Sequence, residues 1–240
     1  KVGITAVSHK VIRNLFEKLI EFNKTEKVIA GFVHKISEKS DVPPIGITEV
    51  TENPDAIAGL NDGKVVGGTT WLWANKISEG VLDYLFVDEA GQMSLSQVLA
   101  ASRAAKNLIL LGDPQQLEQP QRGSHPEGSD VAALTYLLDG HKTIPPDKGL
   151  FLSVTRRLHP LICNFTSELF YEGRLKPLAG LEKQKIIYNG GFSGAGLFYV
   201  PVEHSGNQEK SNEEVDAVER IVNELFNHDT IWVDSNDLQR

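Results

Sequence analysis

The sequence predicts an α/β fold in which a parallel β-sheet is flanked by helices. Short runs of residues that are apolar on both faces recur along the chain, as strands buried on both sides of a parallel sheet require. Segments with apolar residues at helical spacing alternate with these runs. The chain has 240 residues, 40% of them hydrophobic, so it can bury a substantial core in one large domain or two small ones.

Four strands are predicted in the first half of the chain, at residues 2–6, 64–70, 81–87 and 107–111. A helix follows the first strand, because apolar residues recur at helical spacing over residues 11–20. The polar stretch after this helix contains DVPPIG and TENPDA, which predict loops or an excursion from the core. Ser94 is the expected N-cap of a further helix, whose apolar face comprises Leu95, Val98 and Leu99.

The sequence changes in character after residue 125. RGSHPEGSD predicts a loop, VAALTYLL a helix, and TIPPDKG a break that we interpret as a domain boundary, giving domains at 1–140 and 141–240. Strands are then predicted at 149–154 and 196–202, with a helix at 160–171 between them. A last helix is expected to begin at a capping box formed by Ser211 and Glu214.

Composition excludes several classes of protein. With 24 Lys and Arg against 32 Asp and Glu, the net charge of −8 argues against a broad basic surface and leaves room only for a narrow basic groove. No apolar run reaches about 18 residues, and KVGITAVSHK lacks the regions of a secretory signal. The single cysteine, Cys163, excludes an internal disulfide and a multi-cysteine zinc site, so we expect a reducing, cytoplasmic environment.

Polar residues follow two of the predicted strands, at the edge where open parallel sheets bind ligands. An apolar strand that ends in Asp88 and Glu89 suits metal-assisted phosphoryl transfer, in which one carboxylate holds Mg²⁺ and its neighbour orients or deprotonates water. A lone Asp-Glu pair is more often a solvated strand end or a helix cap. Gln92 and Gln116 favour the catalytic interpretation, because they add neutral donors for a terminal phosphate and a water.

These motifs occur in the order of a known helicase family. VDEAGQ, LGDPQQL and TRRLHPLICNFTSELFYEGRL resemble motif II (Walker B), motif III and motif IV of superfamily 1B helicases, in the group related to the nonsense-decay helicase. GITAVSHKVIRNLF resembles motif Ia, and VVGGTTWLW resembles the following segment that contacts nucleic acid. The resemblance spans nearly the whole chain. It implies a RecA-like P-loop NTPase sheet, incomplete in a first domain and followed by the start of a second.

The resemblance also implies roles for individual residues at the nucleotide. Asp88 coordinates Mg²⁺, and Glu89 is the catalytic base. Gln92 and Gln116 sense the terminal phosphate of ATP or link it to the nucleic-acid groove. Arg157 stands where the family places an arginine whose fork contacts a phosphate. The adjacent Arg156 is the alternative, and a surface salt bridge is the competing interpretation of either arginine.

The nucleic-acid contacts implied by the resemblance lie at the ends of other strands. Ser8, His9 and Thr69 are placed to contact the backbone of a single strand, which hydroxyls, main-chain N–H groups and helix N-termini achieve without much net charge. Trp71 and Trp73 either stack on bases, worth roughly 1 to 3 kcal/mol each, or pack in the core. The expected partner is single-stranded nucleic acid, with DNA favoured over RNA.

The Gly-rich loop that a helicase needs to hold phosphates is not found. The nearest candidate, residues 59–65, has too few residues between its glycines, a valine in place of the hydroxyl, and a strand after it instead of a helix. We therefore expect a fragment of a longer helicase, with the phosphate loop before Lys1 and motifs V and VI beyond Arg240. Such a fragment should bind ATP poorly and should not hydrolyse it at the rate of a motor.

The missing phosphate-loop strand has a structural consequence. It should leave the strand at 107–111 with an unpaired edge, which we expect another segment or another copy of the chain to cover.

Three classes of function remain open from the sequence. The first is a portion of an ATP-dependent helicase that moves on nucleic acid. The second is a non-catalytic nucleic-acid-binding or scaffolding module derived from a helicase, which would lack ATPase activity even at full length. The third is a P-loop phosphotransferase unrelated to nucleic acid, which explains Asp88 and Glu89 but not the segments resembling motifs III and IV.

Overall fold

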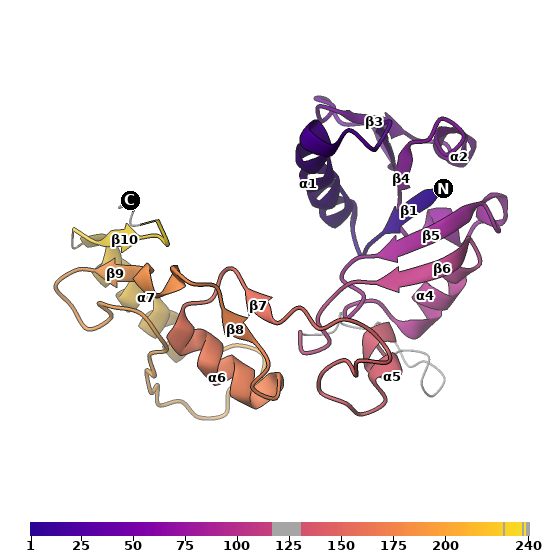
Figure 1. The fold of residues 1–240 in the computed structure, drawn as a ribbon. Helices are drawn as coiled ribbons and strands as arrows, with labels where there is room; N and C mark the ends of the chain where they lie inside the picture. Colours follow the sequence, from indigo (N-terminus) through magenta and orange to yellow (C-terminus); the bar gives the residue numbers. More distant parts are fainter. Residues whose placement is uncertain (117–130, 228, 237, 239–240) are drawn as a thin grey trace. The chain divides into compact units, whose positions relative to one another are not determined.

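A computed structural model describes residues 1–116, 131–227, 229–236 and 238 (Figure 1). The chain divides into two units, a first unit of Lys1–His141 and a second unit of Lys142–Arg240. This division lies next to the break predicted between residues 140 and 141. The predicted loop RGSHPEGSD, at 122–130, lies outside the described residues.

The first unit is built on a six-stranded sheet in the order β3-β2-β4-β1-β5-β6, and every pair of neighbouring strands is parallel. Its strands are β1 (Val2–Thr5), β2 (Phe32–Lys35), β3 (Ile47–Val50), β4 (Val65–Gly67), β5 (Leu82–Val87) and β6 (Ala105–Leu110). The predicted α/β fold with a parallel sheet is therefore confirmed, and it is that of a RecA-like domain. β1 lies inside the sheet, between β4 and β5.

Helices cover both faces of this sheet, because successive strand residues point to opposite sides. On one face, Ile12 and Phe16 of α1 (His9–Glu26) pack with Phe32 of β2 in one buried cluster. On the other face, a second cluster contains Val33 of β2 and the buried side of four helices. These helices are α2 (Asn53–Gly59), α3 (Thr70–Trp73), α4 (Leu95–Ser102) and α5 (Ala133–Leu138). Figure 1 shows α1 and α2 on opposite sides of β4.

The segment between α1 and β4 differs from the prediction. We expected loops or an excursion from the core, but this segment contributes β2, β3 and α2 to the first unit. The expectation was wrong because His34 and Glu49 are buried inside these short strands, where they interrupt the apolar pattern that identifies a strand. DVPPIG is a loop as predicted, whereas TENPDA leads into α2.

The helix between β5 and β6 begins as expected. Ser94 is the N-cap of α4, and it forms a capping box with Gln97. The predicted apolar face is only partly right, because Val98 is buried whereas Leu99 is 57% exposed. Ala101 lies in the buried cluster with Val98.

β6 forms one edge of the sheet, as the sequence predicted for the strand at 107–111. Within the described residues β6 pairs only with β5, and Leu108 is 38% exposed. No other described segment of this chain adds a strand to that edge. The expected coverage by another segment of the chain is therefore not observed among the described residues. Coverage by another copy of the chain stays a prediction.

Within its described residues, the second unit contains two α-helices, a 3-10 helix at Leu181–Lys183 and two small sheets. α6 (Pro160–Phe170) and α7 (Asn212–Asn227) occupy two predicted helical segments, and the Ser211 hydroxyl accepts a hydrogen bond from the Glu214 N–H at 3.2 Å. The short strands β7 (Val154–Thr155) and β8 (Lys176–Pro177) are parallel, whereas β9 (Lys185–Ile187) and β10 (Ile231–Val233) are antiparallel.

The predicted strands at 149–154 and 196–202 are wrong. Only Val154 of these residues belongs to a strand, and the others have no regular secondary structure. Leu150 is 92% exposed and Tyr199 is 90% exposed, so these apolar runs are not buried within the second unit. Among the described residues, none of the helices combines the length and apolar character needed to cross a membrane.

Candidate nucleotide and nucleic-acid site

The predicted site residues of the first unit follow the carboxyl ends of parallel strands, which meet at one edge of the sheet. Ser8 follows β1, Thr69 follows β4 and Asp88 follows β5. β1 is hydrogen-bonded to β4 and β5, and the pairing continues beyond the strands. The Gly68 N–H donates to the Ile4 carbonyl at 3.1 Å, and the Asp88 N–H donates to the Thr5 carbonyl at 2.8 Å. The candidate nucleotide and nucleic-acid residues therefore lie at neighbouring strand ends.

The chain turns sharply after Asp88. The Glu89 N–H donates to the Asp88 carboxylate at 3.1 Å, and the Gln92 N–H donates to the Glu89 carbonyl at 2.8 Å. Glu89 adopts a φ of 54°, in the left-handed region that residues other than glycine rarely occupy. Such strain costs on the order of 1 kcal/mol and is concentrated at functional sites. The turn thus fixes the backbone of Asp88, Glu89 and Gln92 together.

Asp88 has the properties of a ligand for a hydrated cation. Its side chain is partly buried, and this burial raises its pKa despite the hydrogen bond from the Glu89 N–H. A nearby cation would offset the cost of holding the ionised form there. Among the described residues, no group of three His, Cys, Asp or Glu side chains is arranged to hold a metal ion. The single partly buried carboxylate of Asp88 fits Mg²⁺, which usually takes one or two carboxylates and completes its shell with water and phosphate oxygens.

The turns after β5 and β6 are in contact. A methyl group added to Gly91 would lie 2.3 Å from the Asp113 carbonyl oxygen, and one added to Gly112 would lie 2.9 Å from the Ala90 nitrogen. The Ala90 N–H also donates to the Leu111 carbonyl at 2.8 Å. Glycine is needed at both positions, and the φ of 155° at Gly112 further favours it.

Gln116 belongs to the turn that touches Gly91. The Gln115 N–H donates to the Asp113 carboxylate at 2.9 Å, and the Gln116 N–H donates to the Asp113 carbonyl at 3.4 Å. Gln116 is exposed at the end of this turn. The structure thus places the Gln116 backbone beside the turn that carries Asp88 and Glu89, instead of on a distant part of the sheet.

The candidate nucleic-acid residues lie at helix starts. Ser8 is the N-cap of α1, and its hydroxyl accepts a hydrogen bond from the Val11 N–H at 3.4 Å. Thr69 is the N-cap of α3. The two tryptophans of α3 differ: Trp73 is fully buried and donates from Nε1 to the Ile4 carbonyl at 3.0 Å, whereas Trp71 is 85% exposed. Trp73 is therefore a core residue, and Trp71 is accessible for stacking.

His9 is held by a buried network that the sequence did not indicate. Its Nδ1 lies 3.2 Å from Nε2 of His34, whose ring is fully buried and whose Nδ1 has no hydrogen-bond partner. Burial lowers the pKa of His34 to about 4, with smaller contributions from the charges of His9 and Arg13. Burial also lowers the pKa of His9, as do the charges of Lys35 and Arg13. Both rings are therefore neutral near pH 7, and His9 is oriented by His34.

Arg13 completes this network from the next turn of α1. Its guanidinium lies 2.8 Å from the Glu49 carboxylate and 2.9 Å from the Ser40 hydroxyl. Hydrogen bonds from Ser40 and the charge of Arg13 lower the pKa of Glu49, although its burial acts in the opposite direction. The cation of Arg13 is therefore already neutralised within the protein.

The candidate arginines belong to the second unit. Arg156 and Arg157 are both exposed, in the segment between β7 and α6. The N–H of Arg157 donates to the Thr155 hydroxyl at 3.3 Å, which orders its backbone. Arg157 belongs to the second unit, whereas Asp88 and Glu89 belong to the first.

Comparison with known proteins shows which family part of this chain resembles. Residues 52–144, from the start of α2 to just beyond the first unit, match the family described as the viral superfamily 1 RNA helicase core domain. The match includes β5, β6 and their terminal turns. This part of the chain is similar to the superfamily 1 helicases. The resemblance predicted from the motifs is confirmed.

Individual helicases show the same similarity. The chain is 25% identical over 182 residues to the DNA replication ATP-dependent helicase/nuclease DNA2 of Saccharomyces cerevisiae, and 27% identical over 182 residues to that of Schizosaccharomyces pombe. Both alignments cover 73% of this chain. Helicase SEN1 of Saccharomyces cerevisiae is 32% identical over 104 residues, or 42% of this chain. The chain spans only 12%, 12% and 4% of these three relatives.

Similarity to helicases favours use of a nucleotide with Mg²⁺ and binding of nucleic acid. Sequence reasoning had missed the contributions of β2 and β3 to the same edge of the sheet, including His34 and Lys35. One signal was available: GFVHK and GITEV each contain a short β-branched or aromatic run after a glycine, as a strand often does.

Proposed function

We propose that this chain forms part of the motor of an ATP-dependent helicase, coupling ATP hydrolysis to movement on single-stranded nucleic acid. The observation that supports this most directly is the contact between Gly91 and Asp113, because it joins the turn of Asp88 and Glu89 to the turn of Gln116. These residue types at adjacent strand ends suit a triphosphate with Mg²⁺.

At the nucleotide end, Asp88 would hold Mg²⁺, and Glu89 would accept a proton from the attacking water. Gln92 and Gln116 would contact the terminal phosphate of ATP. The guanidinium group of Arg157, or of Arg156 as the alternative, would contact the same phosphate. In this proposal, 1–140 and 141–240 are parts of the first and second RecA-like domains.

At the nucleic-acid end, Ser8, His9 and Thr69 would contact the backbone of a single strand at the starts of α1 and α3. Trp71 would stack on a base, for which its exposure is suitable. We propose DNA as the preferred strand. Two relatives carry DNA replication in their names, whereas the matched family is described as an RNA helicase core domain, so the two nucleic acids need direct comparison.

Two further expectations belong to this proposal. Self-association through the edge of β6 is proposed because that edge pairs with no other described strand. A cytoplasmic location is proposed because Cys163 is the only cysteine of the chain. The alternative of a non-catalytic module is not favoured, since the three relatives are named as helicases and two of them as ATP-dependent.

A glutamine substitution at the candidate base tests the catalytic part of the proposal. Glu89→Gln in the full-length parent protein should lower nucleic-acid-stimulated ATPase about 10²- to 10⁴-fold, the contribution typical of general acid–base catalysis, and leave strand binding unchanged. Glu79→Gln, on the loop before β5, is the control and should retain activity. Full ATPase activity in Glu89→Gln would show that another residue acts as the base.

A further inference from the structure

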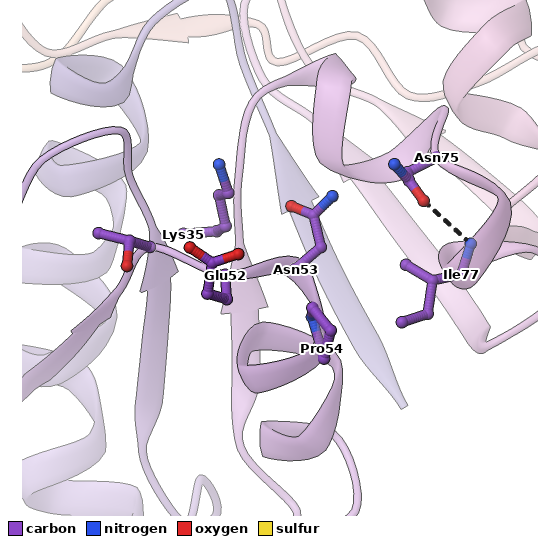
Figure 2. Close-up of a pocket in the computed structure, with 7 residues that line it drawn as sticks. Lys35, Glu52, Asn53, Pro54, Asn75 and Ile77 are labelled. Atoms are coloured by element: carbon purple, nitrogen blue, oxygen red, sulfur yellow. Dashed lines mark hydrogen bonds between the residues drawn. The ribbon is translucent and has the colours of Figure 1, made fainter.

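A hollow of about 330 Å³ opens at the same carboxyl edge of the sheet, beyond the candidate nucleic-acid contacts (Figure 2). Its lining comes from the ends of β2 and β3, the start of α2, and the segment after α3. The lining residues are Lys35, Thr51, Glu52, Asn53, Pro54, Asn75 and Ile77. No residue of this lining was identified as functional from the sequence.

Strand pairing explains why these side chains converge. Lys35 is the last residue of β2 and pairs in register with Val50, the last residue of β3, so Lys35 and Thr51 end neighbouring strands. Glu52 and Asn53 then begin α2. On the opposite side, Asn75 is fixed because its side-chain oxygen accepts a hydrogen bond from the Ile77 N–H at 3.1 Å. Figure 2 shows the Lys35, Glu52 and Asn53 side chains on one side of the hollow and Asn75 on the other.

Lys35 is the cationic side chain of this lining, which also includes the Glu52 carboxylate. It is half-buried, and within the described residues it makes no ion pair, unlike Arg13, which binds Glu49. Its charge helps to lower the pKa of His9, so the two side chains lie within electrostatic range of each other. Since the net charge of the chain is −8, a lysine without an ion pair creates a local site for an anion on an otherwise acidic protein.

The polar lining is also suited to a base. The Thr51 hydroxyl and the Asn53 amide make no hydrogen bond within the described part of the chain, although both are only partly exposed. The exposed Glu52 carboxylate could accept a hydrogen bond from an exocyclic amine of a base, but it would repel a phosphate placed beside it. A phosphate is therefore expected on Lys35, and a base among Asn53, Asn75 and Glu52.

We infer that this hollow holds one nucleotide of the bound single strand, with its phosphate on Lys35 and its base against the amides of Asn53 and Asn75. The inference rests on the proposed function, because it extends the strand from Ser8 and His9 across β4 to the end of β2. These two strand ends are separated by two inter-strand spacings, roughly 10 Å. Lys35 would thus contact the backbone directly beyond the His9 contact.

Single-strand binding by the 240-residue chain, measured by fluorescence anisotropy over a range of salt concentrations, tests the assignment. Lys35→Ala should weaken binding roughly tenfold, the loss of one charge-assisted hydrogen bond, and should reduce the salt dependence by about one phosphate contact. Lys64→Ala is the matched control, because Lys64 precedes β4 at the opposite end of the sheet and pairs with Asp62. It should bind as the wild type does.

Oligonucleotides with one neutral methylphosphonate, moved along the strand, locate the contact. At one position the penalty for a neutral phosphate should disappear in Lys35→Ala, whereas penalties at the contacts of Ser8, His9 and Thr69 should remain. Equal penalties in both proteins at every position would overturn the assignment of Lys35. Circular dichroism and a urea midpoint establish that Lys35→Ala is folded, and Lys35→Arg should restore much of the affinity.

The remaining outcomes separate this inference from the proposed function. If the wild-type chain binds no single strand, the proposed nucleic-acid function fails and this inference fails with it. If the wild type binds and Lys35→Ala binds equally well, only the inference about the hollow fails. Competition of AMP and inorganic phosphate with the oligonucleotide shows whether the hollow binds a strand or a free nucleotide. Lys35-dependent binding of AMP as tight as that of the oligonucleotide would overturn the assignment to a nucleic-acid strand.

Discussion

Replacing Gly91 by alanine would force apart the two turns on which the candidate nucleotide site depends. The added methyl group would lie 2.3 Å from the Asp113 carbonyl oxygen, whereas real contacts of this kind are almost never shorter than 3.0 Å. The obstacle is backbone, so a side-chain rotation cannot relieve it. The turns must separate, which strains the adjacent hydrogen bond from the Ala90 N–H to the Leu111 carbonyl. Overpacking of this kind costs about 1 to 3 kcal/mol.

Urea unfolding followed by tryptophan fluorescence measures this cost, because Trp73 is buried in the first unit while Trp71 is already exposed. Gly31→Ala is the control, since its methyl group would meet only the Lys64 side chain at 3.4 Å. It should be neutral or stabilising by about 0.4 to 1 kcal/mol. Hydrogen exchange of the Ala90 amide should accelerate in Gly91→Ala. Wild-type stability together with unchanged Ala90 exchange would refute the contact between the turns.

Three further predictions concern Asp88, His34 and the two tryptophans. Because burial raises the pKa of Asp88, the protonated carboxyl group stabilises the folded state. This contribution is complete below about pH 3.8 and is lost as the pH rises through the raised pKa of the folded state. Asp88→Asn should therefore raise the urea midpoint at pH 7, and a lowered midpoint would contradict this. His34 has a folded-state pKa of about 4 against 6.5 ordinarily, so the stability it contributes as a neutral ring is present above pH 6.5 and is lost as the pH falls toward 4. His34→Gln should flatten the dependence of the urea midpoint on pH over this interval, and an unchanged slope would count against it. Trp73→Ala should cost about 3 to 5 kcal/mol of unfolding free energy. Trp71→Ala should leave stability unchanged and weaken single-strand binding by roughly 1 to 3 kcal/mol, so unchanged binding would contradict the stacking role.

The parts of the fold that could be predicted from sequence are those with an uninterrupted physical signal. β1, β4, β5 and β6 are apolar runs that end in glycine or polar residues, and α1 has a regular apolar face. β2 and β3 were missed because each has four residues and contains a buried ionisable group. Only the three-dimensional network of His9, Arg13, His34 and Glu49 explains how those groups are accommodated.

The opposite error arose in the second unit. Apolar runs around Leu150 and Tyr199 predicted strands, but an apolar run forms a strand only where a neighbouring strand pairs with it. At the candidate site, motif spacing identified Asp88, Glu89 and Gln116, whereas Lys35 could not be found in this way. Its relation to His9 depends on the order of strands in the sheet, which sequence alone did not establish.

The position of β1 between β4 and β5 limits how the first unit can move. Both neighbours are hydrogen-bonded to β1 up to the residues that precede Ser8, Thr69 and Asp88, so these strand ends cannot slide past one another without breaking the sheet. In the proposed function, the distance between the bound nucleotide and the bound single-stranded nucleic acid should therefore stay constant during a catalytic cycle. Any movement that the proposed function requires must then arise outside this sheet, for which the first unit serves as a rigid reference frame.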